Sequence, residues 1–314
     1  MKTQALTPDQ LEQYHEDGFV IVRDFFAPSE LQPVMDWVDE LVDNLATHLY
    51  ESGKISEKFE NEGFYTRLTA LERAYPGAAV LIHIGGILGQ PLADLWANPR
   101  LLDLVEQVIG PNIAGHPVWN LRTKTPLNPL ATVPWHQDTA YLADGAQRTF
   151  QPTAWIPLVD ANAENGTLQV LRGGHKTGRV LPHHLESSKG HKSSWYLYVE
   201  EEDLPPGDIV TCNMELGSFL LINQLIPHRS TENRSQKIRW SVDLRWQRPD
   251  EISGFEGVKD PILMRSADPN FHLDWGGWTT RSRISAALKE NEGKFDINVM
   301  GPWLDRWAET SSSR

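Results

Sequence analysis

The chain reads Thr153-Ala154-Trp155-Ile156-Pro157-Leu158 and, after Asn165-Gly166, continues as Thr167-Leu168-Gln169-Val170-Leu171. Both runs are short and rich in apolar and β-branched residues, and turn-forming residues bound them, which predicts two β-strands. Asn-Gly favours a tight turn because both residues tolerate a positive φ. This stretch therefore predicts a protein built on short β-strands.

The same pattern of short apolar runs and turn residues continues on both sides of this stretch. Further short apolar or alternating runs are separated by Gly, Pro, Asn and Asp, and they cover residues 117–124, 208–211, 218–222 and 239–247. Many short strands with turn residues between them predict a β-sandwich or a β-barrel.

The first part of the chain carries helical patterns instead. Thr7-Pro8-Asp9-Gln10 has the pattern of a capping box, and the apolar residues 19–22 that follow this helix predict a buried strand. Apolar residues recur at three- and four-residue steps over 28–45, which predicts an amphipathic helix. A second helical stretch over 91–109 is expected to break at Pro99.

We expect one catalytic domain over residues 1–314, because no repeat, low-complexity segment or linker interrupts the chain. It would comprise a helix-rich part (1–110), a β-rich core (111–250) and a C-terminal extension (251–314). Residues 50–90 show no clear pattern. Residues 250–280 look like loop, and a short helix is expected at 282–289.

The composition restricts the partners. Hydrophobic residues make up 40% of the 314 residues, enough for a sizeable core, and the net charge of −13 disfavours nucleic acid and anionic membranes. The single cysteine, Cys212, excludes an internal disulfide and is expected to be a small buried residue. No apolar leader or membrane-spanning run is visible, so we expect a cytoplasmic protein; the oligomeric state is not readable.

The stretch Pro134-Trp135-His136-Gln137-Asp138 carries the first chemical signal. In an extended strand, residues i and i+2 point to the same side, so His136 and Asp138 can converge on one metal ion. Two histidines and one carboxylate, with three open positions, form the ligand set of non-haem iron(II) oxygenases. A His-X-Asp triplet alone is weak evidence, and a second histidine from elsewhere is needed.

His228 is the best candidate for that second histidine. It follows the strand-like residues 218–223 and lies in Ile226-Pro227-His228-Arg229-Ser230, at the edge of a predicted strand. The competing histidines have less suitable settings: predicted helices for His15 and His48, a turn for His175, and opposite faces of one strand for His183 and His184.

Arg239 lies eleven residues after His228, at the start of a predicted strand. A buried arginine needs an anionic partner. A bidentate hydrogen bond to the distal carboxylate of 2-oxoglutarate would supply one. The alternative is an ion pair with a protein carboxylate such as Asp243.

These motifs together resemble the phytanoyl-CoA dioxygenase family of iron(II)/2-oxoglutarate oxygenases. The resemblance covers roughly residues 5–247, and its motifs come in the family's order. They are the opening helix and strand (11–26), Trp135 to Asp138, the strand 153–158, Glu164 to Leu168, the turn 171–176, and His228 to Ser235 with Arg239. The family has Pro-Gly-Ser-His-Lys where this chain has Arg172-Gly173-Gly174-His175-Lys176, which puts only the geometry of that turn in doubt.

The resemblance implies a mainly β fold with flanking helices, a double-stranded β-helix or jelly roll. It implies iron held by His136, Asp138 and His228, with Arg239 on 2-oxoglutarate. It also places Lys124, Trp155 and Ser230 in the co-substrate pocket. From the residues alone, Lys124 could equally be a surface lysine and Trp155 a core residue.

The implied activity is the oxidation of a C–H bond of a small-molecule metabolite by Fe(II), 2-oxoglutarate and O₂, with release of succinate and CO₂. The presence of Asp138 favours hydroxylation over chlorination, since related halogenases replace this carboxylate with a small residue. Two alternatives remain open at this point: a jelly-roll binding protein without redox chemistry, and a cupin-type metalloenzyme that does not use 2-oxoglutarate.

The substrate is not readable from the sequence, and nothing in the charge distribution supports coenzyme A. Candidate pocket residues are Trp119, Tyr141, His83, Trp275 and Trp278, each of which could instead be core. Segments 50–85 and 250–280 are candidate lids.

Overall fold

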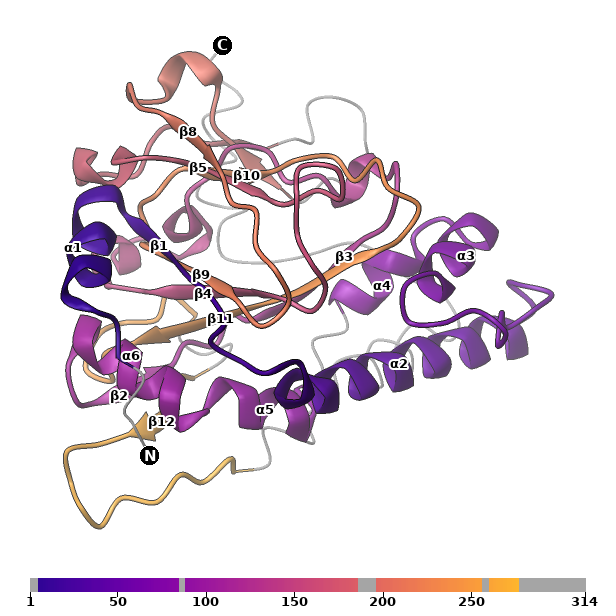
Figure 1. The fold of residues 1–314 in the computed structure, drawn as a ribbon, viewed down its shortest axis with the longest axis horizontal. Helices are drawn as coiled ribbons and strands as arrows, with labels where there is room; N and C mark the ends of the chain where they lie inside the picture. The colour runs from indigo at the N-terminus through magenta and orange to yellow at the C-terminus, as the bar shows by residue number, and fades with distance from the viewer. Residues whose placement is uncertain (1–4, 85–87, 186–195, 256–259, 277–314) are drawn as a thin grey trace.

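Two antiparallel sheets lie face to face in the computed structural model, which describes residues 5–84, 88–185, 196–255 and 260–276 (Figure 1). The larger sheet has the order β1-β9-β4-β11-β2-β12, with β3 also paired to β11. Its strands are Phe19–Val22 (β1), Ile113–Gly115 (β2), Asn120–Lys124 (β3), Thr153–Pro157 (β4), Phe219–Ile222 (β9), Arg239–Gln247 (β11) and Ile262–Arg265 (β12).

The smaller sheet has the order β10-β5-β8 and lies across the inner face of the larger one (Figure 1). Its strands are Leu168–Leu171 (β5), Ile209–Thr211 (β8) and His228–Ser230 (β10), and a two-stranded ribbon pairs His184–Leu185 (β6) with Leu197–Tyr198 (β7). Side chains from both sheets, among them Phe19, Val170 and Leu220, form an apolar cluster between them. This architecture is a jelly roll, as the sequence resemblance implied.

Strand β11 shows how one strand serves two environments. Its sequence, RWSVDLRWQ, is buried along its whole length. Alternate residues face opposite sides of a sheet. The apolar set points to the helical layer and comprises Trp240, Val242, Leu244 and Trp246. The polar set points between the sheets and comprises Arg239, Ser241, Asp243 and Arg245.

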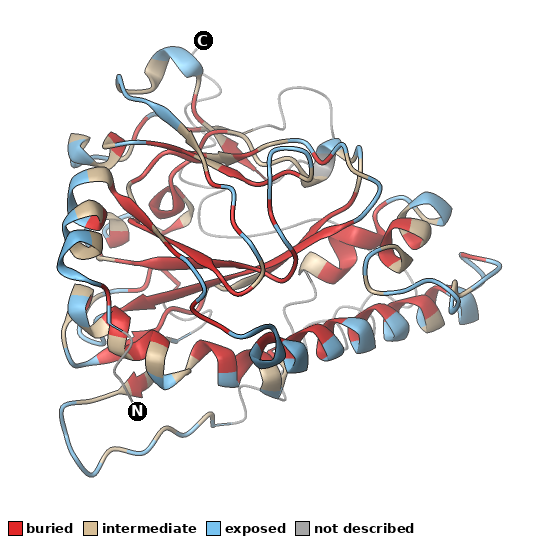
Figure 2. Cartoon of the chain, in the orientation of Figure 1, coloured by how far each residue is buried: buried red, intermediate tan, exposed pale blue. Residues whose placement is uncertain are grey.

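Helices cover the outer face of the larger sheet. The long helix α2 turns its buried side to the sheet and its exposed side to solvent (Figure 2). The helices are Pro8–Asp17 (α1), Pro28–Glu51 (α2), Arg67–Ala74 (α3), Ala78–Ile84 (α4), Gln90–Trp96 (α5) and Pro99–Ile109 (α6). Among the residues described, no helix is both long and apolar enough to cross a membrane.

Several local predictions are confirmed. The capping box at Thr7 and Gln10 forms, and the helical stretch over 91–109 breaks before Pro99. Cys212 is fully buried, and burial raises the pKa of its thiol to about 12. Residues 120–124 form a strand, but the predicted start at Pro117 is too early.

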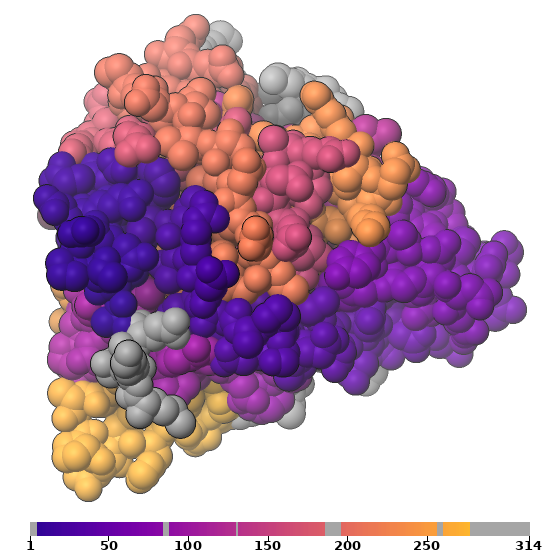
Figure 3. All heavy atoms as spheres, viewed as in Figure 1, coloured from indigo at the N-terminus to yellow at the C-terminus, as the bar shows by residue number. Residues whose placement is uncertain are grey.

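The strand predicted over residues 19–22 is confirmed as β1, which joins the larger sheet. The prediction of loop over 250–280 is wrong where β12 forms, since β12 joins the same sheet. Figure 3 shows the N-terminal segment lying against the orange segment that contains β9 on this face. Residues 50–90, left unassigned, contain α3 and α4. The helix expected at 282–289 lies outside the described residues.

Gly166 carries the chain from the larger sheet to the smaller one. Its φ is +88°, and a Cβ placed there would come within 2.3 Å of Lys124 Cε and 2.8 Å of the Thr231 carbonyl oxygen. Glycine is therefore required both by conformation and by space. The turn predicted at Asn165-Gly166 thus connects two sheets and brings the chain against a buried lysine.

Candidate metal centre and co-substrate pocket

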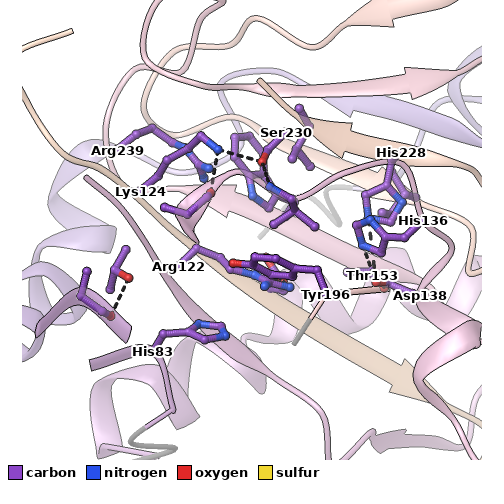
Figure 4. Close-up of a pocket in the computed structure, with 18 of the residues that line it drawn as sticks. His83, Arg122, Lys124, His136, Asp138, Thr153, Tyr196, His228, Ser230 and Arg239 are labelled. Atoms are coloured by element: carbon purple, nitrogen blue, oxygen red, sulfur yellow. Dashed lines mark hydrogen bonds and ion pairs between the residues drawn. The ribbon is translucent and has the colours of Figure 1, made fainter. Parts of the chain in front are cut away.

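His136, Asp138 and His228 meet between the two sheets. Oδ1 of Asp138 lies 3.9 Å from Nε2 of His136 and 3.8 Å from Nε2 of His228. All three side chains are buried, and together they form a group able to hold a metal ion (Figure 4). Two metal–ligand bonds of about 2.1 Å span about 4.2 Å, so one ion placed between these donors can reach Asp138 and each histidine.

Backbone pairing fixes the two histidines. The His136 amide donates to the His228 carbonyl and the His228 amide donates to the His136 carbonyl, both at 3.0 Å. From the sequence, Asp138 was expected to lie in a strand. It instead begins a short 3₁₀ helix, Asp138–Tyr141. Gln137 between them is extended, so the two side chains still emerge on one side.

Gln137 anchors this segment from behind. Its side-chain nitrogen donates to the Leu225 and Arg179 carbonyls, and its side-chain oxygen accepts from the Leu181 amide at 2.7 Å. The Gln137 amide itself donates to Nε2 of His183, so His183 supports the site from outside. These bonds hold the backbone on both sides of the candidate ligands.

Both candidate histidines present the same nitrogen to the site. Nδ1 of His136 lies 2.8 Å from the Pro134 carbonyl, and Nδ1 of His228 lies 3.0 Å from the Ile226 carbonyl. A carbonyl only accepts, so Nδ1 carries the hydrogen and Nε2 keeps its lone pair for a metal. Burial, and then the nearby His228, hold the pKa of His136 well below its usual value, which keeps the ring neutral.

Asp138 is held by its other oxygen. Oδ2 accepts from Nε and Nη2 of Arg245 at 3.1 and 2.9 Å, and from Oγ1 of Thr153 at 3.0 Å. Burial alone would raise the pKa of Asp138, but Arg245 and the two histidines lower it below its usual range. Asp138 is therefore an ionised carboxylate with Oδ1 left to face the histidines. Neither Arg245 nor Thr153 was predicted as a site residue from the sequence.

Arg239 lies farther along the inner face of β11. It is 3% exposed, its Nη1 donates to Oγ of Ser241 at 2.5 Å, and its guanidinium lies 5.0 Å from the Trp155 ring centre. Among the described residues, nothing accepts a hydrogen bond from its Nε and no carboxylate pairs with it. Burial lowers the pKa of Arg239 to about 9, so it is still protonated at neutral pH.

The alternative partner for Arg239 is engaged elsewhere. Oδ2 of Asp243 lies 2.6 Å from Nη2 of Arg122 and 3.5 Å from Nη2 of Arg245. The proposed Arg239–Asp243 ion pair is therefore not formed. A buried guanidinium without a carboxylate partner fits an anionic ligand.

Lys124 faces Arg239 across the β3–β11 pairing. It is 2% exposed, so the alternative of a surface lysine is wrong. Its Nζ donates to Oγ of Ser230 and to the Ala131 carbonyl, both at 2.8 Å (Figure 4). Burial, followed by repulsion from Arg239, holds its pKa well below the usual value. Trp155 is both a core residue and a wall of this pocket.

The sequence of this chain also matches a known protein family. A profile of the phytanoyl-CoA dioxygenase family (PhyH) matches residues 14–241. The chain belongs to the phytanoyl-CoA dioxygenase family. As a member of that family it is an iron(II)/2-oxoglutarate-dependent dioxygenase that acts with O₂, and its substrate is a small molecule.

Two relatives and one solved structure are similar to this chain. A phytanoyl-CoA dioxygenase domain-containing protein 1 homolog from Dictyostelium discoideum is 23% identical over 84% of this chain and 98% of its own length. The 1-deoxypentalenic acid 11-beta-hydroxylase of Streptomyces arenae is 28% identical over 52% of this chain and 60% of its own. The apo structure of the non-heme monooxygenase ThoJ shares the fold, with a TM-score of 0.57 and 18% identity over 96% of this chain and 99% of ThoJ.

Some of the predicted pocket residues lie at the site, and others do not. His83 lines the pocket, and the Tyr141 ring lies 5.7 Å from the His136 ring. Trp119 and Trp275 instead pack against the main core, and Trp278 lies outside the described residues. Tyr196, which the sequence did not single out, also lines the pocket.

The two candidate lid segments differ in whether they line the pocket. The segment 50–85 supplies Ala79, Val80 and His83 to the wall, whereas no described residue of 250–280 lines it.

Proposed function

We propose that His136, Asp138 and His228 hold the iron and that Arg239 binds the distal carboxylate of 2-oxoglutarate. The observation that carries this assignment is a buried guanidinium, with no carboxylate partner among the described residues, in the same pocket as a two-histidine, one-carboxylate cluster. Neither the binding-protein nor the cupin alternative explains both features together.

Bound iron would supply activation of O₂ for C–H oxidation, and the chain would supply position and charge. Nε2 of both histidines and Oδ1 of Asp138 offer three donors on one side of an ion, which leaves other positions for the co-substrate. Arg245 keeps Asp138 ionised. Arg239, with Lys124 and Ser230 beside it, would orient 2-oxoglutarate by its far end, and Trp155 would pack on the same ligand.

The reaction class proposed is hydroxylation, or another oxidation of a C–H bond, of a small-molecule metabolite with release of succinate and CO₂. The single buried thiol supports, but does not test, the expected cytoplasmic location. The single-domain organisation also remains a prediction.

The test is O₂-dependent succinate formation from 2-oxoglutarate by the purified protein with Fe(II), while small metabolites are screened for stimulation. We expect succinate release that requires iron, and loss of that release in His228→Ala. Succinate release by His228→Ala at the wild-type rate would reject the assignment of the ligands.

A further inference from the structure

The pocket extends past the candidate iron and 2-oxoglutarate positions to Arg122 on β3. Its lining includes Arg122 as well as the candidate iron ligands, Lys124 and Arg239. Arg122 lies two residues before Lys124, so both side chains emerge on the inner side of the sheet. Figure 4 shows Arg122 between the Lys124–Arg239 end and the Asp138 end, with the Tyr196 ring next to it and His83 nearby.

The charges lining this pocket do not balance. Among the lining residues that the structure describes, four cationic side chains face two carboxylates: Arg122, Lys124, Arg239 and Arg245 against Asp138 and Asp243. Iron(II) and the 2-oxoglutarate dianion cancel each other, so binding both leaves the surplus in place. The surplus is two positive charges, or one if Lys124 is neutral. It occurs in a chain whose net charge is −13, and buried charge is stable only when it is paired.

Arg122 is the cation best placed to meet a further anion. Its Nε and Nη2 both hold Oδ2 of Asp243, at 2.7 and 2.6 Å, which fixes the plane of the guanidinium. Its side chain is 20% exposed, whereas that of Arg245 is 5% exposed. Among the described residues, no hydrogen bond is formed by Nη1 of Arg122. That edge is thus a pre-oriented donor open to the cavity.

The walls beside Arg122 define the rest of the ligand. Ala79 and Val80 of α4, the helix that packs on β3, give apolar surface. Burial, and then the Arg122 charge, lower the pKa of His83 to about 3, so this ring adds no positive charge at neutral pH. An apolar wall with one fixed guanidinium suits a compact ligand that has an apolar body and one anionic group.

We propose that Arg122 binds a carboxylate of the substrate, and hence that the substrate is a compact organic acid with an apolar body. This inference rests on the proposed function, because it assumes that Arg239 and the iron cluster are occupied by 2-oxoglutarate and iron. It assigns Arg122 to the substrate and not to the co-substrate.

The test uses matched pairs of acids and neutral amides as probes: benzoate and benzamide, cyclohexanecarboxylate and cyclohexanecarboxamide, octanoate and octanamide. Each is titrated without O₂ into the full chain loaded with Fe(II) and 2-oxoglutarate, and the shift of the visible iron–2-oxoglutarate band reports binding. We expect at least one acid to bind on the order of 10- to 100-fold more tightly than its amide, the range of a hydrogen bond to a charged group.

Variants then assign the preference to a residue. Arg122→Gln should remove the preference for the acid and leave 2-oxoglutarate affinity unchanged, whereas Arg122→Lys should keep a weaker preference. Arg234→Gln is the matched control, because that side chain is 75% exposed and pairs with Glu232 at the surface; it should behave as wild type.

Three results would overturn the inference. The first is a wild-type protein that binds no probe, or binds no acid more tightly than its amide. The second is a preference for the acid that survives in Arg122→Gln, and the third is weaker 2-oxoglutarate binding by Arg122→Gln before any probe is added. The first needs no variant, so a failure of Arg122→Gln to fold does not block the test. Absence of the band itself in wild type would reject the proposed function, and the inference with it.

Discussion

Arg245 donates two hydrogen bonds to Oδ2 of Asp138, at 3.1 Å from Nε and 2.9 Å from Nη2. Both side chains are buried, and Oδ1 of the same carboxylate faces the two histidines. The pair thus fixes which oxygen of Asp138 is available to a metal. It also links the candidate ligand to Asp243, since Nη2 of Arg245 lies 3.5 Å from Oδ2 of that residue.

Replacing Arg245 with Gln should weaken iron binding. Residues that orient metal ligands from behind contribute about 10- to 100-fold in metal affinity. We expect a loss in that range, measured by anaerobic titration with Fe(II). Arg234→Gln, which removes an exposed arginine, should leave iron affinity unchanged. Unchanged affinity in Arg245→Gln would show that Asp138 does not need this partner.

Replacing Arg239 with Ala should weaken 2-oxoglutarate binding and spare iron binding. Two charge-assisted hydrogen bonds would be lost, which corresponds to a decrease on the order of 100-fold or more. Equilibrium titration of the iron-loaded protein with 2-oxoglutarate measures this decrease. Wild-type affinity in the variant would favour a metalloenzyme that does not use this co-substrate.

Binding of 2-oxoglutarate should be coupled to proton uptake by Lys124. Burial and Arg239 lower the pKa of this lysine in the free pocket, and an incoming dianion would raise it again. At a pH between the lowered pKa and the ordinary lysine value, the amine therefore gains a proton on binding. Calorimetry in buffers of different ionisation enthalpy detects that proton. Wild type should show uptake and Lys124→Met none; equal behaviour of the two proteins would contradict the coupling.

Replacing Asp243 with Asn should destabilise the fold. Asp243 is buried between Arg122 and Arg245, and its removal leaves the partly buried Arg122 and the buried Arg245 close together without their shared carboxylate. Breaking a buried ion pair in this way costs about 3–5 kcal/mol of unfolding free energy. Urea unfolding measures the loss. Glu16→Gln, which breaks an exposed pair with Lys176, should cause a much smaller loss, because water screens exposed ion pairs. A comparably small loss for Asp243→Asn would refute this account of the pair.

The sequence predicted the parts of the fold that local patterns encode. The capping box at Thr7, the break before Pro99 and the full length of β11 all follow from residue spacing. Strands β2 and β12 were missed because they are short, and their pairing partners lie far away in the sequence. Pairing of distant segments is not visible in the periodicity of either segment.

The site residues also divide into those that the sequence could predict and those that it could not. His136, Asp138, His228 and Arg239 could be selected because their types and spacing match a known chemistry. Arg245 and Arg122 could not, although the alternation of β11 carries a usable signal. In RWSVDLRWQ the apolar positions fill one face, so Asp243 and Arg245 must share the other face with Arg239. Which charges then pair depends on the cross-strand register to β3 and β4, which only the structure provides.

The most direct test of the central claim is an anaerobic titration of the wild-type protein and of Asp138→Ala and His228→Ala with Fe(II), followed by 2-oxoglutarate. The account predicts that wild type binds one equivalent of iron and develops a weak visible charge-transfer band on addition of 2-oxoglutarate. Both variants should lose the band at the same concentrations. A wild-type protein without the band, or a variant that retains it at full intensity, would contradict the assignment of these residues as the iron site.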